Sequence, residues 1–149
     1  MTKEGSFNTF INAIKYLSKG REVDPSFKPD VIVVNHGTND KASESDTVFI
    51  NALKEALECL IEKYPDTPIF YMMPFSQRSV GAIQKTLDTY FADADITVVE
   101  TASWGITSTL GPAFLTDSLH PNAVGARVAG IKLAAAIEEK LGEDFFKVN

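Results

Sequence analysis

The sequence predicts a single α/β domain built on a parallel sheet. Three short apolar runs alternate with longer stretches in which apolar residues recur at helical spacing, and this alternation is typical of βαβ units. The chain has 149 residues, and 44% of them are hydrophobic, which is enough to bury the core of one domain. We therefore expect one domain over residues 1–149.

The expected strands are the apolar runs 31–35, 69–73 and 96–99. The first run, from Val31 to Asn35, begins with four β-branched residues, and such a run is typical of a strand that is buried on both faces. Gly37 follows it, and a glycine lets the backbone turn sharply there. Pro74 ends the second run, because proline cannot continue a central strand.

Apolar periodicity and capping residues predict four helices, over residues 7–17, 45–64, 80–91 and 123–142. Gly20 is expected to stop the first helix, and Asn122 is expected to cap the last one. The last helix is expected to bury Val124, Val128, Ile131, Ala135 and Ile137. Residues 101–121 form a long loop rich in Thr, Ser and Gly, and such a loop in a compact domain is usually functional.

Composition excludes several classes of function. The net charge of −6 and the pI near 4.9 argue against nucleic acid and anionic membranes as partners. No apolar run approaches the ~18 residues of a membrane span. The start of the sequence lacks the apolar core of a signal peptide, which leaves the cellular location unknown. No Cys/His cluster predicts a metal and no glycine-rich loop predicts a nucleotide, so no cofactor is expected.

Two polar motifs carry the chemistry. The first, Gly37-Thr38-Asn39-Asp40, lies just past the carboxyl end of the most apolar strand, where open α/β sheets bind their ligands. The second, Asp117-Ser118-Leu119-His120, precedes the last helix. An Asp and a His three residues apart on one turn can hydrogen-bond, which leaves the other imidazole nitrogen free as a base. An ordinary turn is the alternative for the first motif, because its residue types are common in turns.

In their order and spacing, the two motifs resemble those of the SGNH (GDSL-type) hydrolases, a family of serine esterases and acylhydrolases. The resemblance covers roughly Gly5 to the C-terminus. It implies a three-layer α/β/α sandwich of flavodoxin-like type with five parallel strands, of which this sequence supplies the third, fourth and fifth. It also implies hydrolysis of small acyl or acetyl esters, with carbohydrate acetyl esters, lysophospholipids and simple short-chain esters as candidate substrates.

The resemblance implies a role for four residues. His120 is the candidate base, and Asp117 is the group that orients it. Asn39 offers a side-chain amide to the oxyanion, and Gly5 offers a backbone N–H. Each has a simpler alternative: a solvated histidine, a turn cap, an Asx-turn and a helix-entry turn, respectively.

The nucleophile that the family uses is not found. In the family it is the serine of a Gly-Asp-Ser motif directly after the first strand, and this sequence contains no Gly-Asp-Ser. None of its ten serines follows an apolar β run in the required way. We therefore expect the chain to be the C-terminal part of such a hydrolase, to need an upstream segment for the nucleophile, and to be inactive alone.

Three further residues are supporting candidates. Asp40 completes the first motif, and we expect it to order the loop. His36 is a candidate for the substrate pocket, with a satisfied core histidine as the favoured alternative. Trp104 lies in the long loop, where it could line an acyl or sugar pocket, and local packing is its alternative.

Two other functions stay open at this stage. A catalytically inactive SGNH-like module that binds or supports another chain would share the fold without the nucleophile. A flavodoxin- or receiver-like domain would share the alternation of strands and helices, but the acidic cluster and the lysine that a receiver needs are not found. Hydrolysis of a small ester distinguishes the first of these from an enzyme.

The expected sheet also predicts a contact with another polypeptide. In the family's strand order, the strand from Val31 to Asn35 lies beside the first strand, which this sequence lacks. The most apolar strand would then be an edge, and apolar edges recruit other strands. We expect another copy of the chain, forming a homo-oligomer, or a separate N-terminal partner segment to pair with this edge, or the chain's own N-terminal segment to fold over it.

Overall fold

Of the 149 residues, the computed structural model describes residues 10–18, 21–22, 24, 26–107 and 111–147. The elements, in chain order, are α1 (Phe10–Lys15), β1 (Tyr16–Ser18), β2 (Arg21–Glu22), β3 (Ile32–Val34), α2 (Thr47–Lys63), β4 (Ile69–Met72), α3 (Val80–Tyr90), β5 (Ile96–Val99), the 3-10 helices η1 (Ala102–Trp104) and η2 (Pro112–Phe114), and α4 (Ala123–Leu141).

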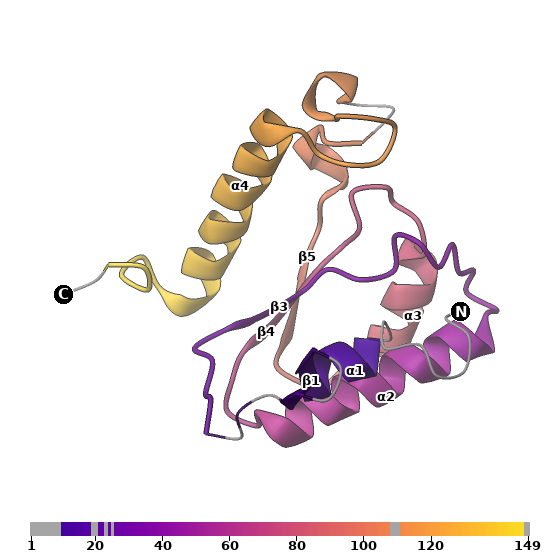
Figure 1. Cartoon of the computed structure of the whole chain (residues 1–149), viewed down its shortest axis with the longest axis vertical. Coiled ribbons are helices and arrows are strands. Elements are labelled where there is room, and N and C mark those ends of the chain that lie inside the picture. The colour runs from indigo at the N-terminus through magenta and orange to yellow at the C-terminus, as the bar shows by residue number, and fades with distance from the viewer. Residues whose placement is uncertain (1–9, 19–20, 23, 25, 108–110, 148–149) are drawn as a thin grey trace.

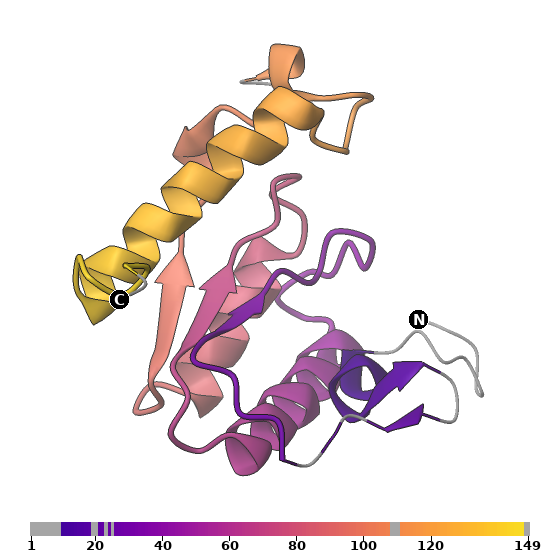
Figure 2. The same ribbon diagram turned by 60° about the vertical axis from the view of Figure 1, so that its left-hand side comes forward.

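The expected parallel sheet is confirmed. β4 lies in the centre and pairs in parallel with β3 on one side and β5 on the other. Helices α2 and α3 cover one face of this sheet and α4 lies on the other face, which makes three layers (Figure 1, Figure 2). The chain therefore has the α/β/α arrangement that the sequence predicted, with three strands in its parallel sheet among the described residues.

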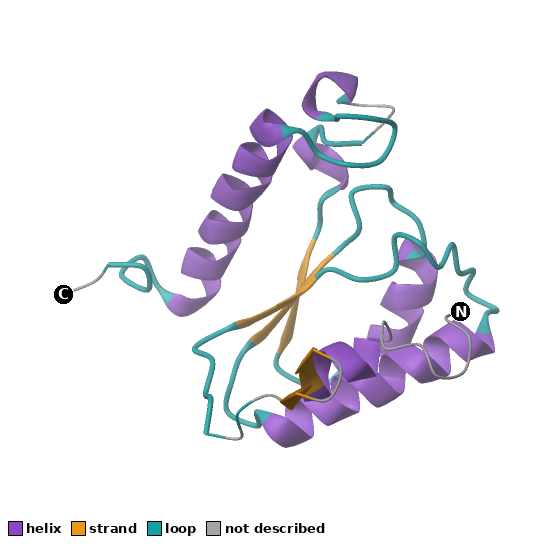
Figure 3. Cartoon of the chain, viewed as in Figure 1, coloured by secondary structure: helices purple, strands orange, loops and turns teal. Residues whose placement is uncertain are grey.

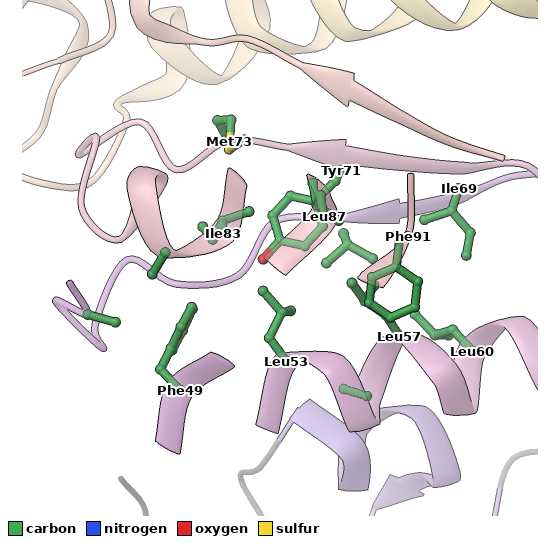
Figure 4. Packing of buried hydrophobic residues seen from close by; sticks show 14 of the residues in the cluster. Phe49, Leu53, Leu57, Leu60, Ile69, Tyr71, Met73, Ile83, Leu87 and Phe91 are labelled. Atoms are coloured by element: carbon green, nitrogen blue, oxygen red, sulfur yellow. The ribbon is translucent and has the colours of Figure 1, made fainter. Parts of the chain in front are cut away.

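The larger part of the core lies between the sheet and helices α2 and α3 (Figure 4). Asp46 caps α2 by accepting a hydrogen bond from the Phe49 N–H, and this satisfies one of the free donors at the start of the helix. The helix then turns one apolar face to the sheet, including Leu53 and Leu57. From the sheet, Tyr71 of β4 enters the same cluster and is fully buried.

The opposite face of the sheet has a smaller core, which consists of Phe70, Met72, Val99 and Ile137. The predicted inner face of α4 is therefore partly wrong. Ile137 is buried as expected and Val128 is half-buried, but Val124 is 58% and Ile131 64% exposed, and Ala135 is exposed too. The small residues Gly125 and Ala129 are buried instead. A Cβ atom at Gly125 would meet the Phe114 carbonyl, so this side of the first turn of α4 packs on η2.

The first helix differs from the prediction. It ends at Lys15, and the chain continues into β1, which pairs antiparallel with β2. The expected stop at Gly20 is therefore wrong, and Gly20 itself lies outside the described residues. Aromatic residues such as Tyr16 favour strands, and the tertiary pairing overrides the weak helical periodicity of this segment.

The outer edge of β3 borders an apolar groove of about 590 Å³. Phe10 and Ile14 of α1, Phe27 of the preceding loop and β3 itself line it. The Ile32 N–H bonds to Pro68 on the β4 side, so the backbone groups of Val33 face the opposite way, toward the groove. The prediction that this strand is buried on both faces is therefore wrong, since Val33 is 39% exposed.

The three strands of the sheet end on the same side of the molecule, and loops follow them there (Figure 2, Figure 3). These loops are the segments 35–46, 73–79 and 100–122, and the last of them contains η1 and η2. Apart from Gly5, the functional residues that the sequence predicts belong to the first and the last of these loops. Within the described ranges, no helix has the length and apolar character to cross a membrane.

Candidate functional site

The loop that carries Asp117 and His120 is shaped by bonds between near neighbours. The Asp117 Oδ1 atom accepts hydrogen bonds from the N–H groups of Leu119 and His120, at 2.7 and 2.8 Å. The carbonyl of His120 accepts from the Thr116 N–H at 2.8 Å, and an antiparallel bridge pairs Leu115 with Pro121. The backbone at His120 is therefore fixed on both its N–H and its C=O side.

The predicted Asp–His hydrogen bond is present. The Oδ2 atom of Asp117 lies 2.8 Å from Nδ1 of His120. With the carboxylate ionised, Nδ1 carries the proton and Nε2 keeps a free lone pair, which is the tautomer that a base requires. Asp117 caps the turn and orients the ring at the same time, so its two predicted roles are compatible.

The Asp117–His120 pair is exposed to solvent. The side chains of His120 and Asp117 are 71% and 53% exposed. The hydrogen bond from the His120 ring, with the backbone hydrogen bonds from His120 and Leu119, lowers the pKa of Asp117 to about 2. Asp117 is therefore ionised at every pH at which a neutral imidazole could act as a base.

The start of α4 supports this loop. Asn122 caps the helix by accepting from the Gly125 N–H, as predicted, and its amide donates to the carbonyl of Ala113 at 2.9 Å. A Cβ atom on Gly125 would lie 2.2 Å from the carbonyl oxygen of Phe114, so only glycine permits this approach. The loop therefore rests directly on the first turn of α4.

The loop that carries Asn39 is held by residues from other elements. The hydroxyl of Tyr71 donates to the His36 carbonyl at 3.2 Å. The Ser79 hydroxyl donates to the Gly37 carbonyl and accepts from the Ala42 N–H, both at 2.8 Å. Gly37 has φ of 110°, which confirms the sharp turn expected there. Asn39 is exposed in the turn that these bonds enclose.

A polar network that the sequence analysis missed joins the ends of the strands. Asn35 donates to the Met72 carbonyl at 2.8 Å, which connects the ends of β3 and β4. The buried Thr101 hydroxyl donates to the Met73 carbonyl at 3.1 Å, and the Gln77 amide donates to Thr101 at 3.0 Å. The only signal in the sequence is that each polar residue follows an apolar strand run, which does not distinguish a network from a turn.

The supporting candidates lie as follows. His36 is not a core histidine, because its side chain is 40% exposed; its ring stacks on Phe10 with centroids 4.8 Å apart. Its Nδ1 atom is 3.9 Å from the Asp40 carboxylate. Trp104 packs beside Phe75 against the smaller core, and a role in a substrate pocket stays a prediction. Gly5 lies outside the described residues.

The Asn39 loop follows β3 and the loop with Asp117 and His120 follows β5, so both begin at the same end of the sheet. No hydrogen bond or ion pair joins them in the part of the chain that the structure describes. The roles of Asn39, Asp117 and His120 therefore stay predictions. Among those residues, no group of three or more His, Cys, Asp or Glu side chains could hold a metal ion.

Two solved structures share this fold. The first is a family two carbohydrate esterase from Clostridium thermocellum in complex with cellohexaose, at 25% identity and a TM-score of 0.63 over 83% of this chain. The second is an acetyl xylan esterase, Est2A, from the rumen bacterium Butyrivibrio proteoclasticus, at 18% identity and a TM-score of 0.62 over 82% of this chain. The chain spans about 40% of the length of each. No protein-family model and no curated protein matches the sequence.

These likenesses support an SGNH-like esterase fold, as expected from the two motifs. Both neighbours are esterases with carbohydrate-related names, and neither name refers to a lipase. Whether this chain takes part in ester hydrolysis, and of which ester, is a matter for proposal.

Proposed function

We propose that this chain forms part of a serine-type ester hydrolase of the GDSL kind that removes small acyl or acetyl groups, with carbohydrate esters as the favoured substrate class. The observation that carries the proposal is the 2.8 Å contact between Asp117 Oδ2 and His120 Nδ1, in a fold shared with carbohydrate esterases. Of the three substrate classes that the sequence left open, carbohydrate esters are the one that the names of both neighbours support.

In this proposal, Nε2 of His120 takes the proton of a serine hydroxyl as the oxygen attacks the ester carbonyl. Asp117 is already ionised, so it stabilises the imidazolium that forms. The side-chain amide of Asn39 donates to the oxyanion, a contact worth about 2.7–4 kcal/mol in comparable sites. His120 then returns its proton to the leaving alkoxide, and water releases the acyl group by the same steps.

The serine comes from outside the residues that the structure describes. In the described part of the chain, no serine hydroxyl is hydrogen-bonded to His120. The buried residue Ser79 contacts the Asn39 loop, but its hydroxyl is already hydrogen-bonded to the Gly37 carbonyl and the Ala42 N–H. A catalytic Asp–His pair works best where water is excluded. The exposure of Asp117 and His120 is therefore expected if the part of the site that carries the serine is not among the described residues.

The apolar groove beside β3 is where we propose that another polypeptide binds. The strand is an edge in the described sheet, its groove is apolar, and its neighbours in the sheet run parallel. A segment that added a parallel strand here would end beside His36 and the Asn39 loop, where a nucleophile is needed. A second copy of the chain at the same edge is the alternative occupant.

The test measures hydrolysis of p-nitrophenyl acetate and acetylated xylan. The isolated 149-residue chain should not exceed background, because loss of a nucleophile costs on the order of 10⁶ in rate. If the coding sequence upstream of Met1 supplies Gly-Asp-Ser after a strand, the longer protein should hydrolyse acetyl esters, and His120→Ala should abolish this. Light scattering on the same samples reports whether copies of the short chain associate.

Two results would contradict the proposal. Turnover by the short chain that disappears when one of its own serines is replaced would place the nucleophile inside it. A folded longer protein that binds acetylated xylan without cleaving it would favour the second candidate function, a catalytically inactive binding module. The observation that keeps this second candidate open is the exposed Asp117–His120 pair, to which no described serine is bonded.

A further inference from the structure

We propose that Ser79 is a positioning residue that fixes the loop from His36 to Ala42, and through it the amide of Asn39. The inference rests on the proposed role of Asn39 as oxyanion donor. Ser79 lies 42 positions from Gly37 in sequence, directly before α3. Neither the two motifs nor the likeness to the esterases assigns it a role.

The hydroxyl of Ser79 joins both ends of the loop. It donates to the Gly37 carbonyl and accepts from the Ala42 N–H, and both contacts are 2.8 Å. The residue is only 6% exposed, so water cannot easily replace either bond. One oxygen atom thus closes the segment that contains Thr38, Asn39 and Asp40.

The backbone of Ser79 has an unfavourable conformation, which the surrounding structure must hold in place. Its φ of 60° and ψ of 4° are left-handed, a region that non-glycine residues occupy rarely and at a cost. The Cβ atom of Ser79 also lies close to the loop: a Cβ atom on Gly37 would be 3.4 Å from it and 3.0 Å from Ile83 Cδ1. Gly37, Ser79 and Ile83 are therefore packed together, and the loop cannot move without disturbing the start of α3.

Asn39 depends on this support because no described residue holds its side chain. In the described residues, its amide has no hydrogen-bond partner, and the residue is exposed. An oxyanion donor must be free of other partners and yet fixed in position. Among the described residues, the position of Asn39 is therefore set by its backbone, which Ser79 holds on both sides through Gly37 and Ala42.

The experiment uses NMR on the 149-residue chain, which requires no activity. Ser79→Ala removes the hydroxyl and keeps the Cβ atom, and Ser79→Gly removes the hydroxyl and relieves the left-handed strain. In both variants we expect the Asn39 side-chain amide signals to shift and the Ala42 N–H to exchange about tenfold faster. Exchange in β4 and β5 should not change by a comparable factor.

Thr86→Val is the matched control. Thr86 is a fully buried residue of α3, and among the described residues its hydroxyl bonds only to the Ala82 carbonyl of the same helix. This variant should leave the Asn39 and Ala42 signals unchanged. Unchanged signals in both Ser79 variants, equal shifts in Thr86→Val, or failure of both Ser79 variants to fold would each overturn the positioning role.

The result is separate from the test of the proposed function. If the loop loosens in the Ser79 variants but the longer protein hydrolyses no ester, the positioning role of Ser79 holds and the proposed esterase function is wrong. If the longer protein hydrolyses esters but the loop signals do not change in the Ser79 variants, the esterase function holds and the positioning role is wrong.

Discussion

The two loops of the candidate site are built in opposite ways. Asp117 and His120 are held by bonds to residues within a few positions along the chain and by the first turn of α4. The Asn39 loop is held by Tyr71 and Ser79, which bond to residues 35 to 42 positions away. One half of the site is therefore a local motif placed on a helix, and the other half exists only once the sheet and α3 have packed.

The largest effect on folding is expected where the local motif meets α4. Gly125→Ala should destabilise the chain by about 1–3 kcal/mol, because the new Cβ atom would lie 2.2 Å from the Phe114 carbonyl and force the loop off the helix. Gly130→Ala is the control on the same helix, since a Cβ atom at Gly130 would meet nothing within 4 Å. It should stabilise by about 0.5–1 kcal/mol, because alanine favours helix.

Denaturant unfolding of both variants measures this difference. If the two glycines respond with the same sign, the close contact between the Asp117 loop and α4 does not exist in solution. The comparison between the loops would then fail, because the local motif would lack its support.

A smaller effect is expected in the loop that depends on distant residues. Tyr71→Phe removes the hydroxyl that donates to the His36 carbonyl, at a cost of about 1 kcal/mol. Burial and the Asp40 carboxylate both raise the pKa of Tyr71, so its hydroxyl stays protonated and remains a donor. Amide exchange should quicken in residues 36–42 and stay unchanged in residues 115–120.

Tyr90→Phe is the control for this variant, because Tyr90 is 47% exposed on α3 and its change should stay within about 0.5 kcal/mol. Faster exchange at His120 in Tyr71→Phe would show that the two loops are coupled. The division into a local and a distant half would then be wrong.

The same division explains what the sequence could predict. The Asp117–His120 bond was predictable because it spans three residues, and a short spacing fixes geometry through the turn itself. The three strands were predictable because each is a short continuous apolar run, and α2 was predictable from its helical periodicity. Asn122 as a cap needed only its position before an apolar helix.

The errors share a physical cause too. The inner face of α4 was wrong at Val124 and Ile131 because helical periodicity marks an apolar stripe but not which part of it becomes covered. The start of the helix packs on Phe114 through Gly125 instead. The end of the first helix was wrong because β1 pairs with β2, which helical periodicity does not encode. Ser79 and Thr101 were missed because a serine before a helix and a threonine after a strand are ordinary in sequence, and only packing gives them partners.

The smallest effect on folding, and the sharpest test of the local half, concerns the Asp117 carboxylate. Its pKa is lowered to about 2, first by the His120 side chain and then by the backbone N–H groups of His120 and Leu119. Because the folded-state value lies below the unfolded one, the pair stabilises the fold above about pH 4. That contribution is lost as the pH falls toward 2.

His120→Ala removes the largest cause and keeps the backbone bonds, so the pKa of Asp117 should rise toward 3.8 without reaching it. Carboxyl NMR titration measures both proteins. Asp24 is an internal control, because the Ser26 hydroxyl and N–H lower its pKa in the same titration and His120 plays no part in that. An Asp117 that titrates at an ordinary value in the unaltered chain would mean that the imidazole is not held, and the local motif would lose the one bond that makes His120 a candidate base.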